Sequence, residues 1–404
     1  MKGLFKNTKI QSYGIEQKKF NQKKQILKLI FFDGPLANSE IAAHLGLSTP
    51  KINSLLLELI DDGLVVDNGP GDSSGGRRPN IYGLVEDGFY VAGISIGIHQ
   101  TVISLFNSKN DDICEPHSFP VTIKEGIGVL KTVSECLNQV INYCGIDRNK
   151  IITAGIEMPG LVNTYEGLNK TYFPEENLYA ELEKIFDYPV FFENDAKVRT
   201  FAEQHFGLAK GHQNVLMVNI SWGVGLGIII NGQLYTGNSG FAGEFGHLPI
   251  VDNGILCKCG KKGCLETIAS ASAIARLAKE GIMDGNSSLL KELVDKNIEK
   301  IETSTVIAAA NAGDQFSISV LSNVGYWLGK GIALLIQIFN PELIIIGGRV
   351  GEASHFMKAP IEQAINSFSN HHISNDTEIK FSALGSKSGT MGAAAYALEK
   401  LANL

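Results

Sequence analysis

The sequence lacks a run of about 20 consecutive apolar residues, the length that a membrane-spanning helix requires. Its longest apolar stretch, residues 332–339, is interrupted by Gln337 and is followed by Asn340 and Pro341. The amino-terminal residues are rich in Lys and amide side chains and lack the apolar core of a secretory signal. We therefore expect neither membrane insertion nor secretion, and we predict a cytoplasmic location.

The chain also has little net charge. Its 35 Lys and Arg against 42 Asp and Glu give −7, which argues against a nucleic-acid partner for the chain as a whole. However, residues 1–80 contain 11 Lys and Arg against 8 Asp and Glu, so this segment is basic and the remainder is strongly acidic. Such an asymmetry indicates separate partners for the two parts, with a basic solvated tail as the alternative. The length of 404 residues corresponds to two or three domains, and the 44 glycines indicate many tight turns.

The basic segment has the spacing of three helices. Apolar residues recur at helical spacing over residues 19–32, and the Asp-Gly-Pro at 33–35 ends this helix. Asn38 or Ser39 is expected to cap a short second helix, and the Ser-Thr pair at 48–49 a third. The third helix is predicted to bury its apolar face: Ile52, Leu55, Leu56, Leu59 and Ile60.

Two short apolar strands, at residues 64–67 and 80–82, flank a turn rich in Gly and Arg and predict a β wing. Helices and wing together have the order of a winged helix-turn-helix domain, in which one helix enters the major groove of double-stranded DNA. Arginines at the wing tip could reach phosphates or a narrow minor groove. The candidate DNA contacts are Ser48, Thr49, Lys51, Asn53, Ser54, Arg77 and Arg78. A helical protein-interaction module without DNA contacts is the alternative.

From about residue 86 onward, strand patterns alternate with helical ones, which predicts an α/β domain with two lobes. Strands are expected at residues 90–96, 101–106, 151–156, 189–192, 215–220, 226–230 and 343–346. Helices are expected at residues 126–144, 195–206, 269–280, 315–339 and 392–403.

The most specific chemical signal is Cys-Lys-Cys-Gly-Lys-Lys-Gly-Cys at residues 257–264, preceded by His247. Three thiolates and an imidazole form a Cys₃His set that suits tetrahedral zinc, and Gly260 and Gly263 let the chain fold back. A cluster of buried free cysteines is the alternative. The other cysteines lie in strand or helix patterns and are expected to be core residues: Cys114, Cys136 and Cys144.

A second group of polar residues lies in glycine-rich or strand-end settings. Asn194 and Asp195 follow the predicted strand at 189–192, and open α/β sheets bind ligands at strand ends. Glu244 and Glu266 flank the cysteine motif. Carboxylates and amides suit sugar hydroxyls, although each residue taken alone would be a surface charge or a helix cap.

Several motifs resemble, in their order, the signatures of the ROK family (repressors, open reading frames and sugar kinases). The motifs are Gly-Ile-Glu-Met-Pro-Gly at 155–160, Glu-Asn-Asp-Ala at 193–196, Gly-Glu-Phe-Gly-His at 243–247, the cysteine motif through Glu266, Asn-Pro-Glu at 340–342 and Gly-Gly at 347–348. The resemblance covers essentially the whole chain. It implies a winged helix-turn-helix domain at residues 1–85 and a two-lobed actin-like (ribonuclease-H-like) ATPase fold at 86–404.

The resemblance also implies a sugar or sugar phosphate between the lobes. The implied sugar contacts are Asn194, Asp195, Glu244, His247 and Glu266, and the implied zinc ligands are His247, Cys257, Cys259 and Cys264. In the family's kinases, the residue at position 195 is the base that deprotonates the accepting hydroxyl.

The phosphate-binding loops of the family's kinases are altered in this sequence. Their opening hairpin resembles Asp-x-Gly-Gly-Thr-Lys, whereas residues 95–100 read Ser-Ile-Gly-Ile-His-Gln. Their Gly-Thr-Gly-x-Gly loop corresponds to Ser-Trp-Gly-Val-Gly at 221–225. We therefore predict a sugar-responsive repressor of carbohydrate-utilisation genes that acts as a homodimer or tetramer and keeps Asp195 as a vestigial base. An active sugar kinase with an appended DNA-binding domain, and an adaptor controlled by protein contacts, are the alternatives.

Overall fold

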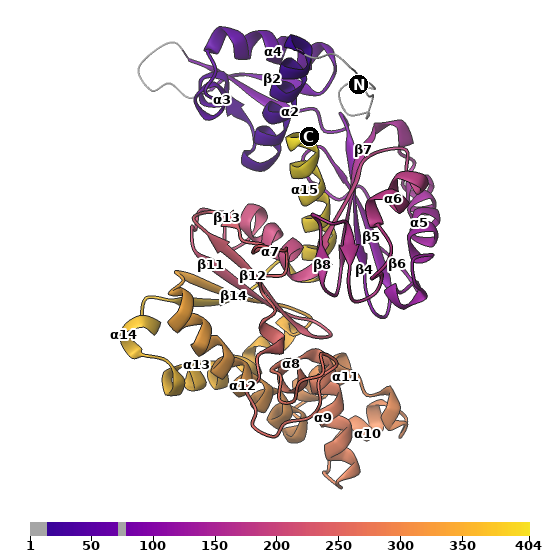
Figure 1. The fold of residues 1–404 in the computed structure, drawn as a ribbon, viewed down its shortest axis with the longest axis vertical. Helices are drawn as coiled ribbons and strands as arrows, with labels where there is room; N and C mark the ends of the chain where they lie inside the picture. The colour runs from indigo at the N-terminus through magenta and orange to yellow at the C-terminus, as the bar shows by residue number, and fades with distance from the viewer. Residues whose placement is uncertain (1–13, 72–77) are drawn as a thin grey trace. The chain divides into compact units, whose positions relative to one another are not determined.

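The computed structural model describes residues 14–71 and 78–404 and divides into two compact units (Figure 1). The first unit joins the chain up to Val198 with Gly389–Leu404, and the second spans Arg199–Ser388. Each unit contains one five-stranded sheet of mixed direction, which confirms the predicted α/β class.

The amino-terminal part of the first unit has the helices and wing that the sequence predicts. Its helices are α2 (Ile15–Asp33), α3 (Asn38–Leu45) and α4 (Thr49–Asp61). Its antiparallel sheet has the order β1-β3-β2 and consists of β1 (Leu36–Ala37), β2 (Val65–Pro70) and β3 (Asn80–Leu84). The predicted apolar face of α4 is confirmed as core: Ile52, Leu55, Leu56 and Leu59 are buried, and Ile60 is half-buried.

The start of α3 differs from the prediction. Its N-cap is Ala37, not Asn38 or Ser39. Ala37 is held extended by its pairing with Ile81 in β3, so the chain turns into the helix one residue earlier than its side chains suggest. Because Ala has no side-chain acceptor, the capping contact runs the other way, with the Ala37 N–H donating to Glu40 Oε2 at 2.7 Å.

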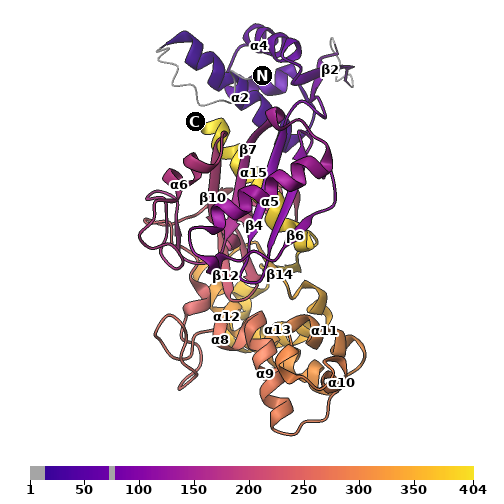
Figure 2. The same ribbon diagram turned by 90° about the vertical axis from the view of Figure 1, so that its right-hand side faces the viewer.

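The large sheet of the first unit has the order β10-β7-β4-β5-β6. Its strands are β4 (Tyr90–Ile96), β5 (Thr101–Asn107), β6 (His117–Phe119), β7 (Ile151–Met158) and β10 (Val190–Asn194). β4 and β5 form the predicted hairpin, and β8 (Val162–Asn163) pairs with β9 (Leu168–Asn169) beyond β7. Figures 1 and 2 show α5 (Val129–Cys144) and α6 (Leu178–Ile185) on one face of the sheet and α15 (Ser388–Asn403) on the other.

The sheet of the second unit has the order β13-β12-β11-β14-β15. Its strands are β11 (Val215–Ile220), β12 (Val224–Ile230), β13 (Gln233–Leu234), β14 (Leu343–Gly348) and β15 (Glu378–Phe381). Its helices are α8 (Glu266–Ala269), α9 (Ala271–Met283), α10 (Leu290–Leu293), α11 (Thr303–Asn311), α12 (Gln315–Phe339), α13 (Ser354–Phe368) and α14 (His371–Ser374), and α7 (Asp195–Phe206) crosses the boundary between the units. The helix predicted at 269–280 is found as α9 but begins two residues later, because Ser270 caps α9 by accepting from the Ala273 N–H at 3.0 Å.

Helix α12 is long and apolar enough to cross a membrane by length and composition, although the sequence has no continuous apolar run of that length. However, 56% of its most apolar 18-residue window is buried inside the protein. Leu321, Val324, Leu328 and Ile332 of α12 belong to the hydrophobic core of the second unit. Its apolar character is therefore that of a central core helix.

The cysteines outside the 257–264 motif follow the prediction only in part. Cys136 is a buried residue of α5, as expected. Cys114 and Cys144 instead form a disulfide that closes a separation of 30 residues, with their Cα atoms 6.1 Å apart. Both are half-buried, so they form a covalent link between the segment after β5 and the end of α5.

Candidate functional site

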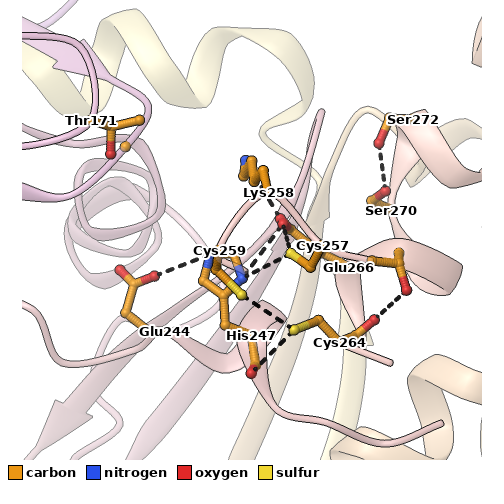
Figure 3. Close-up of polar contacts among 12 residues, drawn as sticks. Thr171, Glu244, His247, Cys257, Lys258, Cys259, Cys264, Glu266, Ser270 and Ser272 are labelled. Carbon is orange, nitrogen blue, oxygen red and sulfur yellow. Dashed lines mark hydrogen bonds and ion pairs between the residues drawn. The ribbon is translucent and has the colours of Figure 1, made fainter. Parts of the chain in front are cut away.

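Three cysteines and one histidine of the second unit converge on one point (Figure 3). The candidate ligand atoms of His247, Cys257, Cys259 and Cys264 all lie within 4.8 Å of one another. Cys259 Sγ is 3.5 Å from Cys264 Sγ, and Cys257 Sγ is 3.5 Å from His247 Nδ1. Ligands bound to a tetrahedral zinc ion at about 2.0–2.3 Å lie roughly 3.3–3.8 Å from one another, so these two pairs have the spacing of zinc ligands and the cluster is consistent with a zinc site.

Backbone turns bring these ligands together. His247 ends a short 3₁₀ turn at Phe245–His247, and the cysteine loop folds back through an antiparallel bridge between Leu256 and Lys262. Gly263 has a φ of 75°, and a Cβ at this position would collide with the carbonyl oxygen of Val251. Only glycine fits there, which confirms the predicted role of this residue in closing the loop.

The electrostatics of the cluster suit a cation. Burial raises the pKa of the Cys257 and Cys264 thiols, whereas the backbone N–H of Lys261 lowers the pKa of Cys259. Burial also lowers the pKa of His247, which favours the neutral imidazole that binds a metal. A divalent cation would stabilise all three thiolates, so metal binding and thiol deprotonation are linked.

Two carboxylates flank His247. Glu266, the first residue of α8, has Oε1 3.5 Å from His247 Nδ1 and accepts a hydrogen bond from Cys257 Sγ at 3.0 Å. Glu244 Oε2 lies 3.8 Å from His247 Nε2 on the other side of the ring. The structure thus brings together three of the five predicted sugar contacts in the second unit. The contact of Glu266 with a metal ligand was missed by sequence reasoning, although its position two residues after Cys264 is a signal for it.

The remaining predicted sugar contacts, Asn194 and Asp195, belong to the first unit. They lie at the carboxyl end of β10 and the start of α7, as predicted. The Asn194 side chain donates to the carbonyl oxygen of Gly160 at 3.1 Å and accepts from the Ala196 N–H at 3.0 Å, so its amide is held in a fixed orientation. Glu193, the preceding residue of β10, is buried and accepts a hydrogen bond from the Asn194 N–H at 2.8 Å.

The two segments that the sequence predicts to be altered phosphate loops lie at hairpin turns. Residues 97–100 connect β4 and β5, and Ser95 donates a hydrogen bond of 2.5 Å to Glu157 Oε1 on the adjacent strand β7. Glu157 is buried, and although it belongs to the motif at 155–160, the sequence did not indicate this contact because its partner lies on another strand. Trp222 lies between β11 and β12, and 42% of its surface is exposed.

The third helix of the winged domain presents the predicted DNA-contact residues to solvent. Ser48, Thr49, Lys51, Asn53 and Ser54 of this segment are all exposed. Ser48 is the N-cap of α4, as predicted, although its side chain makes no capping hydrogen bond.

The wing contributes basic residues. Arg78 is exposed, and Arg77 lies outside the described residues.

A buried lysine of α2, which sequence reasoning missed, links two helices of the winged domain. Lys23 Nζ lies 3.0 Å from Asp62 Oδ2 and 3.1 Å from Glu58 Oε2, and so braces α2 against α4.

Comparisons with known proteins agree with this architecture. The family model "ROK family" matches residues 91–400, and the model "Winged helix-turn-helix DNA-binding" matches residues 21–66. The chain is 30% identical over 387 residues to the xylose repressor of Bacillus spizizenii, covering 95% of this chain and 96% of that one. It is 32% identical over 317 residues to a glucokinase of Halalkalibacterium halodurans, covering 76% of this chain and 94% of that one. A solved ROK family transcriptional regulator, a homologue of the Escherichia coli MLC protein, has a TM-score of 0.78 at 27% identity and covers 95% of this chain and 97% of its own.

The matches extend over both the winged domain and the α/β part, and they confirm the fold: a winged helix-turn-helix domain followed by the two-lobed actin-like ROK fold. DNA binding is the role of the winged domain, and the Cys₃His cluster is consistent with the zinc site typical of ROK proteins. The chain belongs to the ROK family, as a transcriptional regulator with an amino-terminal winged helix-turn-helix domain.

Proposed function

We propose that this protein is a sugar-responsive repressor whose ROK domain senses a sugar and does not phosphorylate it. The observation that carries this proposal is the pair formed by Ser95 and the buried Glu157, at the hairpin where the family's kinases bind phosphate. Ser stands where the kinases have Asp, and the Thr and Lys that would meet phosphate are replaced by His99 and Gln100. A second anionic group, such as a phosphate, would be repelled by the buried Glu157 carboxylate beside this hairpin.

The second altered loop supports the same conclusion. Trp222 places an indole in the turn where the kinases have a Thr hydroxyl. Indole is much larger than a Thr side chain and carries its one N–H donor on the ring edge, so it does not place a donor where the compact Thr hydroxyl would meet a phosphate oxygen. Loss of phosphate binding leaves Asp195 without a phosphoryl donor to act on, and its carboxylate then serves to hold a sugar hydroxyl.

The proposed sugar contacts are Asn194, Asp195, Glu244, His247 and Glu266. Their carboxylate, amide and imidazole groups accept and donate in the pairs that vicinal hydroxyls require. His247 and Glu266 also touch the metal cluster, so zinc would hold the loop that carries them in one conformation. The chemistry that zinc supplies here is structural crosslinking of four side chains.

The proposed regulatory cycle couples the two domains. Operator DNA is bound by two or four winged domains of a homodimer or tetramer in the cytoplasm. Sugar binding favours a conformation in which these domains no longer match the operator, and this weakens DNA binding. The name of the similar xylose repressor supports a sugar or sugar phosphate as the effector.

A sugar kinase is the second candidate. The similar glucokinase and the presence of Asp195 favour it. It predicts ATP-dependent turnover, whereas the repressor predicts none.

The two candidates are separated by one set of measurements on the full chain. Thermal shift with D-xylose, D-glucose and their phosphorylated and N-acetylated relatives should find at least one stabilising sugar. A coupled assay with ATP should then show no phosphorylation of that sugar. Turnover would establish the kinase instead, and the absence of a thermal shift with every sugar would favour an adaptor controlled by protein contacts.

A further inference from the structure

Helix α15 is seated on the large sheet of the first unit at unusually close range. Gly93 of β4 and Gly155 of β7 face it, and a Cβ at either position would collide with a carbonyl oxygen of α15, from Thr390 or Ala393. Ser104 of β5 also donates to Thr390 Oγ1 at 3.0 Å. Backbone contact at two glycines leaves α15 little freedom to move independently of the strands.

The middle of α15 contacts the end of β10. The Tyr396 hydroxyl donates to Glu193 Oε2 at 3.3 Å, in a buried setting. Burial raises the pKa of Tyr396 well above its usual value, and the Glu193 charge adds to this shift, so the hydroxyl keeps its proton. Glu193 accepts from the Asn194 N–H at 2.8 Å through its other oxygen, and Lys197 Nζ lies 3.6 Å from that same oxygen. Tyr396 is thus two hydrogen bonds away from the backbone of a proposed sugar contact.

The last turns of α15 contact the winged domain. Glu399 pairs with Lys28 of α2 at 2.9 Å, and both side chains are only about a quarter exposed (23% and 26%). Gln25 of α2 donates to the carbonyl oxygen of Ala402 at 2.9 Å, and Asn403 donates to Glu399 at 2.9 Å. In Figure 1 the carboxyl terminus accordingly lies beside α2. A partly buried, hydrogen-bonded ion pair is a stronger link than an exposed one.

From these contacts we propose that α15 transmits the state of the sugar site to the DNA-reading domain. Tyr396 acts as a positioning residue: through Glu193 it couples the position of α15 to that of the end of β10. Glu399, one helical turn later, transmits a shift of α15 to Lys28 of α2. The proposal rests on the sugar-responsive function proposed above. It adds a physical path within the first unit: a rigid helix whose middle contacts the end of β10 and whose last turns contact α2.

The chain offers a matched control for the link to α2. Lys19 lies on the same helix and pairs with Glu58 of α4 at 2.6 Å, wholly within the winged domain. Lys28→Ala and Lys19→Ala therefore remove the same charge from the same helix, and only the first breaks a contact with α15. Any general loss of DNA attraction should be equal in the two variants.

The first experiment needs no ligand. Hydrogen exchange, followed by mass spectrometry on the full chain, would compare Lys28→Ala, Lys19→Ala and the unaltered protein. We expect Lys28→Ala to accelerate exchange at least threefold both in α15 and in residues 190–198, with no change there in Lys19→Ala. Acceleration confined to α2 and the final residues of α15 would overturn the proposal, because the contact would then be only a local anchor.

The second experiment measures the coupling itself. An operator is selected from random duplexes with the unaltered chain, and its affinity is measured with and without each candidate effector: D-xylose, D-glucose and their phosphorylated and N-acetylated relatives. We expect Lys28→Ala and Tyr396→Phe to bind the sugar within about twofold of the unaltered chain, while the sugar-induced loss of operator affinity falls toward onefold. A full sugar response in both variants would overturn α15 as the path. If the unaltered chain shows no sugar response, the proposed function fails, and the exchange experiment still decides whether α15 couples the two elements.

Discussion

Glu266 Oε1 lies 3.0 Å from Cys257 Sγ, so a carboxylate proposed to bind sugar touches a side chain proposed to bind zinc. The same carboxylate is 3.5 Å from His247 Nδ1. A ligand that pulls on Glu266 therefore acts on the metal cluster, and a change in the cluster alters where Glu266 points. Sugar affinity and metal content should depend on each other for this reason.

Removing one metal ligand tests the zinc assignment on which this link depends. Cys259 is exposed, so Cys259→Ala deletes a thiolate without opening a cavity. Elemental analysis should find about one zinc per chain in the unaltered protein and less than a tenth of that in the variant. Cys136→Ala, which removes a buried thiol of α5, should retain the metal. A well-folded, metal-free preparation of the unaltered chain would contradict the assignment.

The wing makes a separate prediction about salt dependence. Replacing Arg77 and Arg78 with Ala should weaken duplex binding and reduce the slope of log affinity against log salt by about 0.9 for each lost phosphate contact. Lys184→Ala is the control, since this lysine is exposed on α6 and pairs with Glu181. An unchanged slope in the double Arg variant would remove the wing from the DNA interface.

Helices and strands whose own residues carry a clear apolar pattern and a clear end could be predicted from the sequence. The bounds of α7, α12 and β11 agree with the structure because each has a clear apolar pattern and a clear end. At the end of α12, Asn340 adopts a left-handed conformation with a φ of 43° and Pro341 cannot continue the helix. The cysteine spacing likewise encodes its own loop, so the Cys₃His cluster could be predicted in full.

Contacts between distant segments could not be predicted in this way. Ser95 and Glu157 pair across two strands, and Lys28 and Glu399 are separated by 371 positions, so no local pattern records either pair. Helix α13 was also missed, and it contains Pro360, which lacks the N–H that a helix interior requires. It is stabilised by packing on α12, where a Cβ at Gly329 would lie 2.5 Å from the carbonyl oxygen of Ile361. Tertiary packing here overrides local propensity.

Asp314 predicts a pH dependence of stability in the second unit. It caps α12 by accepting from the Ser317 N–H at 2.9 Å, and it also accepts from the Ser288 hydroxyl at 2.7 Å. Burial alone would raise its pKa, but these hydrogen bonds outweigh burial and leave the pKa below its usual value of 3.8. Because the folded-state pKa is the lower one, the stabilisation is fully present above the unfolded pKa and is lost as the pH falls through the folded pKa.

Asp314→Ala should accordingly lower the free energy of unfolding by about 1–2 kcal/mol near neutral pH, and by less in acid. Urea denaturation at several pH values measures both effects. Glu362→Ala, which removes an exposed carboxylate of α13, should change stability little at any pH. A pH-independent effect of Asp314→Ala would show that the carboxylate charge is not what stabilises the start of α12.

The disulfide between Cys114 and Cys144 makes the last prediction. Closing a segment of 30 residues restricts the unfolded chain, so reduction should lower the free energy of unfolding of the first unit by about 3–4 kcal/mol. Urea denaturation of the purified chain with and without dithiothreitol measures this difference. Cys114→Ser should behave like the reduced protein in both conditions, whereas Cys136→Ala should keep the full response to dithiothreitol. Peptide mapping after alkylation identifies the crosslink directly, and recovery of Cys114 and Cys144 as separate alkylated peptides from air-oxidised protein would contradict the pairing.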